Sequence, residues 1–362
     1  MIDVRVAGHS ISPILSAPPR INDQADAVCR TLELSLKNDS FLSGLLGKPV
    51  ELYNGKERWY FGNFFKRGAD TEGQATLLAY DPLFYFKRNP DDYYYPKNTM
   101  TASKVFVDLA AKIGMKTAKI ANTKIILPAL FYQAADPDKI LVDVLARTKA
   151  SGGKSFWYRF DPSLDNFGLY LYERIVPKEV WAFQVGVNIT SASYEANAEE
   201  LVTQVKLINR ETGKVVIRKN EGQAKAFGKL QHFEEVNKDE APNMDRKAKQ
   251  LLDELSKIKV TSKVDGINPG NMPQLFSGDL IYVEEKYTGL IGAYYIRNIT
   301  QQLEGGGFVS IGMDIEAAQS VPAIQYENAT KNPNEDKEKK KEKEKSKEQS
   351  KEQKKVSDNY GL

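Results

Sequence analysis

Few residues in this chain have the type and spacing that catalysis or metal binding requires. The 362 residues include two histidines, His9 and His232, and one cysteine, Cys29. Zinc sites need ligands at short, regular spacings, and the sequence contains neither a CxxC pair nor an HExxH segment. We interpret both histidines as surface or packing residues, and Cys29, in an alternating segment, as a small hydrophobic residue. The sequence therefore predicts no catalytic residue, no metal site and no cofactor.

Two weaker chemical patterns need a test. Gly153-Lys154-Ser155 is similar to the end of a phosphate-binding loop, but the required upstream glycine falls at Thr148. The segment also follows a predicted helix and precedes a predicted strand, which reverses the order that aims backbone amides at phosphate. We reject this loop. Glu51 and Glu173 remain open as a glycosidase pair, although carboxylates on sheet surfaces are ordinarily solvated charges.

Aromatic residues offer a different kind of binding surface. The run 93–95 is three tyrosines, and Trp157, Tyr158, Tyr170 and Tyr172 lie in a predicted hairpin. Such side chains can stack on sugar rings, but at strand spacing they more often form a core or a subunit interface. We favour core or interface, and keep glycan binding as an alternative.

The elements that would position these residues include two β-rich blocks, 47–81 and 278–314, with the same order of features. Each block begins with glycine and an alternating segment, turns at an Asn-Gly or Thr-Gly pair, continues with an aromatic strand, and ends in an alternating segment that closes with aspartate. This order is typical of antiparallel strands joined by hairpins. Further alternating segments lie upstream, at 28–36 and 201–208. We interpret the blocks as a duplication.

Residues between and after these blocks follow a helical period. Apolar spacing predicts helices over 101–113 and 137–150, and the aromatic alternation after Gly153 predicts a hairpin. A third helix is predicted over 244–258. The Gly-, Lys- and Glu-rich stretch 219–242 before it is predicted to be a long, mobile loop.

The predicted fold class is mainly β with an α/β middle portion: two related antiparallel β-barrels, a small α/β domain and a helical insertion. The first barrel is expected at 1–98 and the middle domain at 99–186. The second barrel is expected at 187–318, with a loop and helix inserted at about 219–258. A charged flexible tail occupies 319–362.

Charge is concentrated in that tail. Residues 331–362 hold 11 of the 51 basic and 8 of the 48 acidic residues, which leaves 40 of each elsewhere. A neutral body argues against specific nucleic-acid binding, because holding phosphates needs concentrated Lys and Arg. Residues 337–355 are only Lys, Glu, Ser and Gln, so they have no apolar surface to bury and are expected to form a solvated tether. Apolar residues return at the end, where Val356, Tyr360 and Leu362 form a candidate docking peptide for a partner.

No apolar run approaches membrane-spanning length, and the first residues lack the basic flank and apolar core of a signal peptide. We therefore expect synthesis in the cytoplasm and no stable membrane insertion.

Several short motifs together resemble a known family. The resemblance spans about residues 4–315, and its motifs are soft markers of fold rather than catalytic signatures. The family is that of the baseplate-hub proteins of contractile phage tails, grouped with the late-control D proteins and the upper part of type VI secretion spikes. The motifs that carry it are Arg30-Thr31-Leu32-Glu33-Leu34, Gly47-Lys48-Pro49-Val50, Phe61-Gly62-Asn63, Ala79-Tyr80-Asp81, Thr101-Ala102-Ser103, the hairpin after Gly153, Ser193-Tyr194-Glu195 and Gly278-Asp279.

The resemblance implies a homotrimer whose two barrels per chain form a pseudohexameric ring. Such a ring docks the hexameric tail tube on one side and a spike on the other, beside other baseplate proteins, in a virion or a phage-tail-like bacteriocin (tailocin). The chain departs from the family in its Lys/Glu tail and in lacking a recognisable fused lysozyme or spike. It is thus expected to be structural and non-enzymatic. The alternatives are a tail-associated cell-wall hydrolase or glycan-binding module, and a cytoplasmic β-barrel scaffold unrelated to phage.

Overall fold

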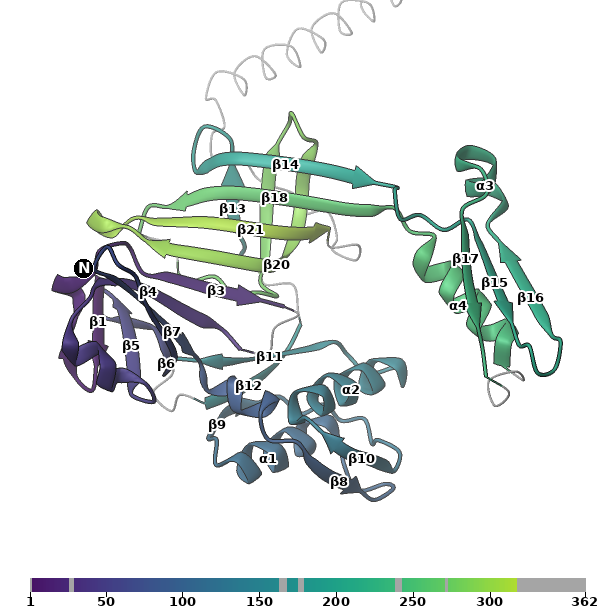
Figure 1. The fold of residues 1–362 in the computed structure, drawn as a ribbon, viewed down its shortest axis with the longest axis horizontal. Helices are drawn as coiled ribbons and strands as arrows, with labels where there is room; N and C mark the ends of the chain where they lie inside the picture. Colours follow the sequence, from purple (N-terminus) through teal and green to yellow (C-terminus); the bar gives the residue numbers. More distant parts are fainter. Residues whose placement is uncertain are drawn as a thin grey trace, which may run out of the picture. The chain divides into compact units, whose positions relative to one another are not determined.

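The computed structural model describes residues 2–25, 29–162, 168–174, 179–237, 243–270 and 273–317, apart from the side chains of Phe41 and Ser43. The protein is mainly β, and its largest feature is a sheet of 13 strands (Figure 1). The chain supplies these strands in two groups. The first group is β1 (Ile2–Val6), β2 (His9–Ser10), β3 (Arg20–Gln24), β4 (Thr31–Lys37), β5 (Pro49–Asn54), β6 (Glu57–Ala69) and β7 (Gln74–Tyr80). The second is β13 (Trp181–Gln184), β14 (Ile189–Asn197), β18 (Lys259–Asn268), β19 (Leu280–Glu285), β20 (Leu290–Leu303) and β21 (Val309–Ala317).

The strand order follows one path, β14-β18-β21-β20-β3-β4-β7-β6-β5-β1-β2, with β19 also pairing β20 and β13 pairing β19. Among the described strands of this sheet, β13 and β19 pair in parallel and the other paired strands are antiparallel. Buried and partly exposed residues alternate along the strands. In β4, for example, Leu32, Leu34 and Leu36 are buried, and the residues between them are partly exposed. This two-residue period is the one that places every second side chain on the same face of a sheet.

The two groups repeat one arrangement. Strands β4-β7-β6-β5 are ordered as β18-β21-β20-β19 are. Both long strands carry a bulge, between Phe64 and Lys66 in β6 and between Ile296 and Asn298 in β20.

The glycines that open the blocks are also equivalent. Gly47 and Gly278 have φ of +79° and +86°, a region that favours glycine. The Gly47 N–H donates to the Phe64 carbonyl at 2.8 Å, and the Gly278 N–H donates to the Ile296 carbonyl at 2.7 Å. The shared order of the blocks read from the sequence is thus present as shared strand pairing.

Two details of the predicted repeat are wrong. Segment 201–208 does not join the second meander; the counterpart of β4 is β18, since β18 pairs β21 as β4 pairs β7. The closing aspartates are not equivalent either. At the two bulges, Phe64 pairs with Ala79 and Ile296 pairs with Ile315, so Ala79 and Ile315 are equivalent positions. Asp81 follows Ala79 in the chain, whereas Asp314 precedes Ile315. Sequence spacing could not reveal this, because the loops between the strands differ in length.

The middle portion contains the predicted helices and hairpin. Helix α1 (Ala102–Ile113) begins at Thr101, whose hydroxyl accepts from the Lys104 N–H, and ends at the left-handed Gly114. Helix α2 (Pro137–Ala150) has proline in its first turn. The hairpin is β11 (Phe156–Asp161) and β12 (Gly168–Glu173), with β9 (Thr117–Ile120) parallel to β12, while β8 (Asp91–Tyr95) pairs β10 (Leu130–Ala135).

An inserted unit lies in the chain between β14 and β18. It comprises β15 (Gln204–Ile208), β16 (Val215–Lys219), α3 (Glu221–Phe227), β17 (Gln231–Glu235) and α4 (Met244–Leu255). The predicted helix is present, but the long loop predicted over 219–242 is wrong for 219–237, because α3 and β17 occupy it. Strand β17 pairs in parallel with β15, a long-range contact that local composition cannot reveal.

Short 3-10 helices complete the described elements: η1 (Ser12–Ile14), η2 (Ser40–Leu45), η3 (Pro82–Lys87) and η5 (Gly305–Gly307). None of the helices among the described residues is long and apolar enough to cross a membrane.

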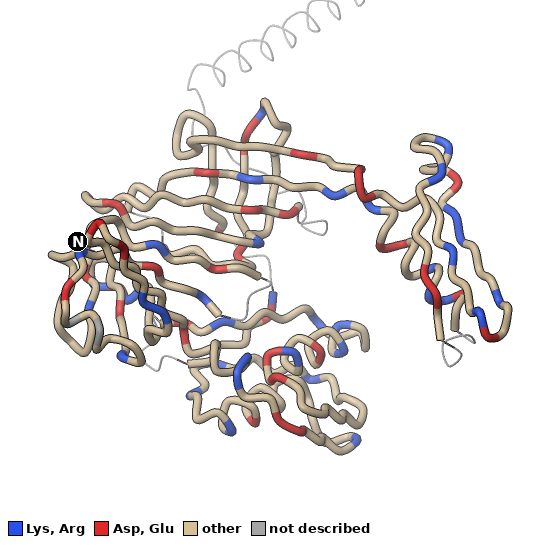
Figure 2. The backbone as a smooth tube through the Cα atoms, viewed as in Figure 1, with Lys and Arg blue, Asp and Glu red and all other residues tan. Residues whose placement is uncertain are grey.

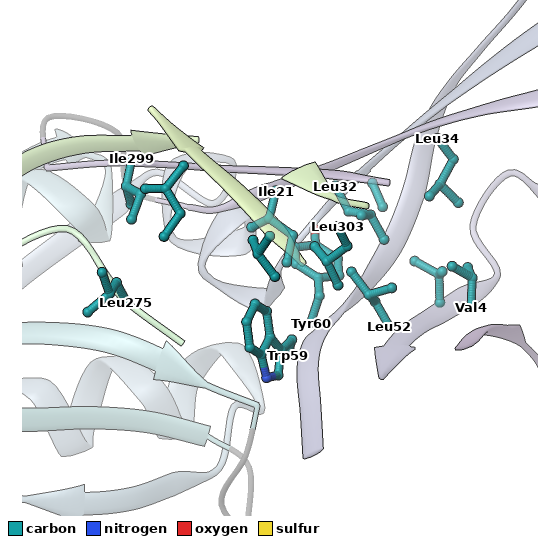
Figure 3. Packing of buried hydrophobic residues seen from close by; sticks show 14 of the residues in the cluster. Val4, Ile21, Leu32, Leu34, Leu52, Trp59, Tyr60, Leu275, Ile299 and Leu303 are labelled. Atoms are coloured by element: carbon teal, nitrogen blue, oxygen red, sulfur yellow. The ribbon is translucent and has the colours of Figure 1, made fainter. Parts of the chain in front are cut away.

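Buried residues form three clusters. The first draws on both strand groups: Ile21 and Leu32 share it with Ile299 and Leu303 (Figure 3). The second belongs to the middle portion and includes Phe86, Phe106, Leu141, Phe160 and Leu171. The third belongs to the insertion and contains Val205, Leu207, Val236, Met244 and Ala248.

Candidate functional site

The residues considered for catalysis lie in ordinary structural settings. His9 is exposed on the short strand β2, and His232 lies on β17 with Nε2 3.5 Å from Glu234. Gly153 and Lys154 follow α2 and precede β11, the helix-to-strand order that led us to reject a phosphate loop. Among the described residues, no group of His, Cys, Asp and Glu could hold a metal ion.

The two candidate glycosidase carboxylates are each paired with a cation. Glu51 lies 3.0 Å from Arg58 Nη1, and Glu173 lies 2.6 Å from Lys154 Nζ. They belong to different sheets, since Glu51 is in β5 and Glu173 is in β12. Each carboxylate is thus accounted for by an ion pair, and the two belong to separate sheets.

The aromatic residues divide between core and surface. Tyr93 and Tyr95 are buried in the middle cluster, and Tyr158 packs edge-on against Phe106 at 5.3 Å between ring centroids. Tyr94 is exposed. This agrees with the interpretation as core for most of the tyrosine run and for Tyr158.

The remaining three aromatics surround two arginines. The Arg174 guanidinium lies over Trp157 at 5.1 Å, and the Arg159 guanidinium lies over Tyr170 at 5.6 Å and Tyr172 at 5.2 Å. Cation–π packing therefore occupies these rings within the chain itself.

A cluster of buried and partly buried charged residues lies beside the large sheet. We call it the junction cluster, because its members come from both strand groups and from the middle hairpin. Sequence reasoning did not single it out, although charged residues interrupting apolar strand patterns were a usable signal. Its members are Asp23, Arg30, Asp81, Arg159, Phe276, Ser277 and Asp279.

Phe276 is the apolar centre of the junction cluster. The Arg159 guanidinium carbon lies 3.8 Å from its ring centroid, and that of Arg30 lies 4.7 Å away. Arg159 also pairs with Asp161 at 3.2 Å and with Asp279 at 3.4 Å. A single ring thus brings together two cations from distant parts of the chain.

Arg30 and Asp81 are almost fully buried. The Arg30 backbone N–H donates to Asp81 Oδ2 at 3.1 Å, and Arg30 Nε lies 3.7 Å from Asp23. Burial raises the pKa of Asp81 to about 7, against the lowering effect of the Arg30 and Leu83 backbone N–H groups. Burial likewise raises the pKa of Asp279.

A cavity of about 240 Å³ adjoins the junction cluster and is lined by Cys29, Arg30, Asp81, Arg159 and Ser277 among others. Burial raises the pKa of the Cys29 thiol to about 12, so the thiol is not a nucleophile near neutral pH. The arrangement can hold strands together, and its described residues do not include an activated nucleophile paired with a base.

Charges elsewhere are interspersed. Lys and Arg alternate with Asp and Glu along the backbone trace instead of gathering on one element (Figure 2). The candidate docking residues Val356, Tyr360 and Leu362 lie outside the described residues.

Comparison with known proteins identifies the class first. A 43 kDa tail protein of prophage MuSo2 from Shewanella oneidensis has the same fold, with a TM-score of 0.62 at 13% identity, covering 87% of this chain and 98% of that one. The fold is thus that of phage-tail proteins, and the resemblance drawn from the sequence motifs is confirmed.

The particular family follows from the sequence. The chain belongs to the YQBQ-like family, whose model matches residues 20–316. It is 26% identical over 276 residues to the uncharacterized protein YqbQ of Bacillus subtilis (strain 168), covering 75% of this chain and 81% of YqbQ. It is also 26% identical over 260 residues to the phage-like element PBSX protein XkdQ of the same strain, covering 70% of this chain and 76% of XkdQ.

Proposed function

We propose that this protein is the structural hub of a contractile tail or phage-tail-like bacteriocin, in which three copies form a ring between the tail tube and the spike. The observation that carries the proposal is the repeated strand order within one chain. Three chains with two equivalent units each present six similar surfaces, which suit a six-fold tube, while true three-fold symmetry remains for a spike.

In this proposal the strand groups curl into two related barrels, a separate middle domain lies between them in the chain, and 319–362 form the flexible tail. The boundaries expected from the sequence, barrels at 1–98 and 187–318 and a middle domain at 99–186, both move: β8 pairs β10 of the middle portion, and β13 pairs β19 of the second strand group. Separate buried clusters for the middle portion and the insertion support this division, because a domain needs a core of its own.

The hub acts by contact rather than by catalysis. The ion pairs of Glu51 and Glu173 and the raised thiol pKa of Cys29 support a structural role. Its partners in this proposal are a second and third copy, the tube protein, the spike and other baseplate proteins. It is made in the bacterial cytoplasm and assembled there into the particle.

The tail is proposed to be a tether that ends in a hook. A solvated spacer raises the local concentration of a weak peptide without fixing its orientation, and three copies add avidity. Val356, Tyr360 and Leu362 supply the apolar contacts of that peptide.

The solution mass of the full chain, measured by light scattering after gel filtration, tests the ring. A mass of three chains is expected, together with binding to assembled tail tube in a pull-down. A monomer that digests purified peptidoglycan, and loses this activity on Glu51→Gln or Glu173→Gln, would instead support the hydrolase alternative.

A further inference from the structure

Each strand group has one further strand beside the repeated four. In the first group β3 pairs with β4, and in the second β14 pairs with β18. Because β4 and β18 are equivalent, β3 and β14 occupy equivalent positions in the two groups.

Pairing registers make this equivalence specific to single residues. The bulges match Phe64 with Ile296, and their cross-strand partners match Ala79 with Ile315. Leu32 lies opposite Ala79, and Ser262 lies opposite Ile315.

The outer strands then follow from the same registers. Ile21 lies opposite Leu32 in β3, and Tyr194 lies opposite Ser262 in β14. Tyr194 is therefore the counterpart of Ile21.

Within the chain, β3 joins the two groups. It pairs antiparallel with the second half of β20, from Gln24 opposite Asn298 to Arg20 opposite Gln302. The counterpart of this half of β20 is the end of β6, residues 66–69. On the side away from β7, no described strand pairs with residues 66–69, and no described strand pairs with the outer edge of β14 along residues 191–197.

Hydrogen bonds show which residues of these two edges direct their backbone N–H and C=O groups outward. These residues are the counterparts of the ones that pair at the internal β3–β20 junction. At the internal junction the Ala25 N–H donates to Arg297 and the Leu303 N–H donates to Pro19, so positions 19, 21, 23 and 25 of the β3 segment face β20. The counterparts of 19, 21 and 23 are Ala192, Tyr194 and Ala196.

Other hydrogen bonds, one at each unpaired edge, give the same result for which residues face outward. The Ile267 N–H donates to the Asn188 carbonyl, which directs Ser193 and Glu195 toward β18 and leaves Tyr194 and Ala196 facing out. The Asp70 N–H donates to the Gln74 carbonyl, which leaves Arg67 and Ala69 facing out from β6.

We propose that β14 of one copy pairs antiparallel with the end of β6 of the next copy, in the register of the internal β3–β20 junction. Asn197 then lies opposite Lys66, Ala196 opposite Arg67, and Tyr194 opposite Ala69. The inference rests on the proposed ring and names the strands that close it. The contact is head-to-tail, so it uses two different edges and leaves one of each free until a ring closes.

Burial and charge fit this partner. Ile21 at the internal junction is fully buried, whereas its counterpart Tyr194 is 50% exposed and would be covered by the next copy. Its opposite residue, Ala69, is small enough to leave room for the ring. Glu195 lies diagonally across from Lys66, within reach of long side chains of opposite charge. Unpaired strand edges also invite aggregation, so a regular occupant is expected.

A disulfide tests the register. In a Cys29→Ala background, Lys66→Cys and Asn197→Cys occupy a pair that is not hydrogen-bonded, with Cα atoms about 4.5 Å apart, which is within the range of disulfides. Oxidation of the full chain should give covalent dimers and trimers and no larger species. The matched pair Lys66→Cys and Ser193→Cys is out of register by about 13 Å and should not cross-link.

Two prolines test the edge without the need for oxidation. Ala196→Pro removes an outward N–H that would donate to Arg67 of the next copy, and should shift the mass from trimer to monomer. Edge strands tolerate proline where the N–H faces solvent, so circular dichroism should be unchanged. Ala192→Pro is the matched control: its counterpart is already Pro19, so the trimer should persist.

The outcomes separate this inference from the proposed function. A trimer that cross-links through 66 and 197 and is lost with Ala196→Pro supports both. A trimer that fails to cross-link at reactive cysteines, or that survives Ala196→Pro, overturns the strand pairing while the ring stands. A chain that stays monomeric at every concentration tested overturns both.

Discussion

Asp23 and Ser277 are joined by two hydrogen bonds although 254 positions separate them. The Ser277 N–H donates to Asp23 Oδ2 at 3.0 Å and its hydroxyl donates to Oδ1 at 2.8 Å. Both residues are buried, and Arg30 lies beside Asp23. The carboxylate thus fixes the segment before β19 against β3, so it holds the first strand group to the second.

Removal of this carboxylate should be costly. Asp23→Ala leaves the Ser277 donors without their acceptor and the buried Arg30 without the carboxylate 3.7 Å from its Nε, so we expect a loss of about 3–5 kcal/mol in the free energy of unfolding. Urea denaturation measures it. Asp265→Ala is the matched control, because Ser191 donates to Asp265 at 2.7 Å in an exposed setting and about 1 kcal/mol or less should be lost. Equal losses of unfolding free energy in Asp23→Ala and Asp265→Ala would contradict the expectation that the buried Asp23 contacts contribute more than the exposed Asp265 contact.

Gly278 and Gly47 form a second matched pair. Both have positive φ, so alanine at either should cost about 1–2 kcal/mol. A Cβ at Gly278 would also overlap the Trp157 indole, whereas one at Gly47 meets no atom within 4 Å.

Gly278→Ala should therefore destabilise the protein by about 1–3 kcal/mol more than Gly47→Ala, measured by thermal and urea unfolding. Trp157→Ala combined with Gly278→Ala should remove most of this difference. If the difference persists in the double variant, the Trp157 contact is not its cause.

The buried Asp81 should make stability fall as pH rises. Its folded-state pKa is about 7, and its ordinary value is 3.8. Between these values the folded protein holds a proton that the unfolded chain has lost, so the free energy of unfolding decreases through this window and levels off above it.

Asp81→Asn should flatten this part of the pH profile, which urea midpoints at pH 4.5, 6 and 8 would measure. Asp70→Asn is an exposed control whose backbone contacts lie in a turn, and it should leave the slope unchanged. A wild-type profile that rises from pH 4.5 to 8 and is unaffected by Asp81→Asn would contradict the assignment.

The proposed hook gives a functional prediction. Deletion of 356–362 with the charged spacer retained should lower the yield of infectious or bactericidal particles, while the mass and melting temperature of the purified chain stay unchanged. A scrambled sequence of the same seven residues is the control. Full yield from the deletion would leave the tail as a solubilising segment only.

Local patterns in the sequence predicted α1, α2 and α4, the hairpin after Gly153 and the repeated meanders, because periodicity and turn residues determine those elements directly; α3 was missed. Long-range pairing was out of reach. Nothing in residues 20–24 indicates that β3 lies beside β20, and the polar stretch 219–237 conceals a strand that depends on β15. The junction cluster was missed for the same reason: Asp23, Arg30 and Ser277 become a site only when three distant segments meet.

The insertion between β14 and β18 leaves and re-enters the sheet at a single cross-strand pair, Asn197 opposite Lys259. The Cα atoms of such a pair are about 5.5 Å apart, a span that a tight hairpin turn can close. The unit from β15 to α4 is therefore a pendant that can be exchanged without altering the strands that carry it. We expect that a fluorescent reporter put in its place would mark the particle without disturbing the sheet.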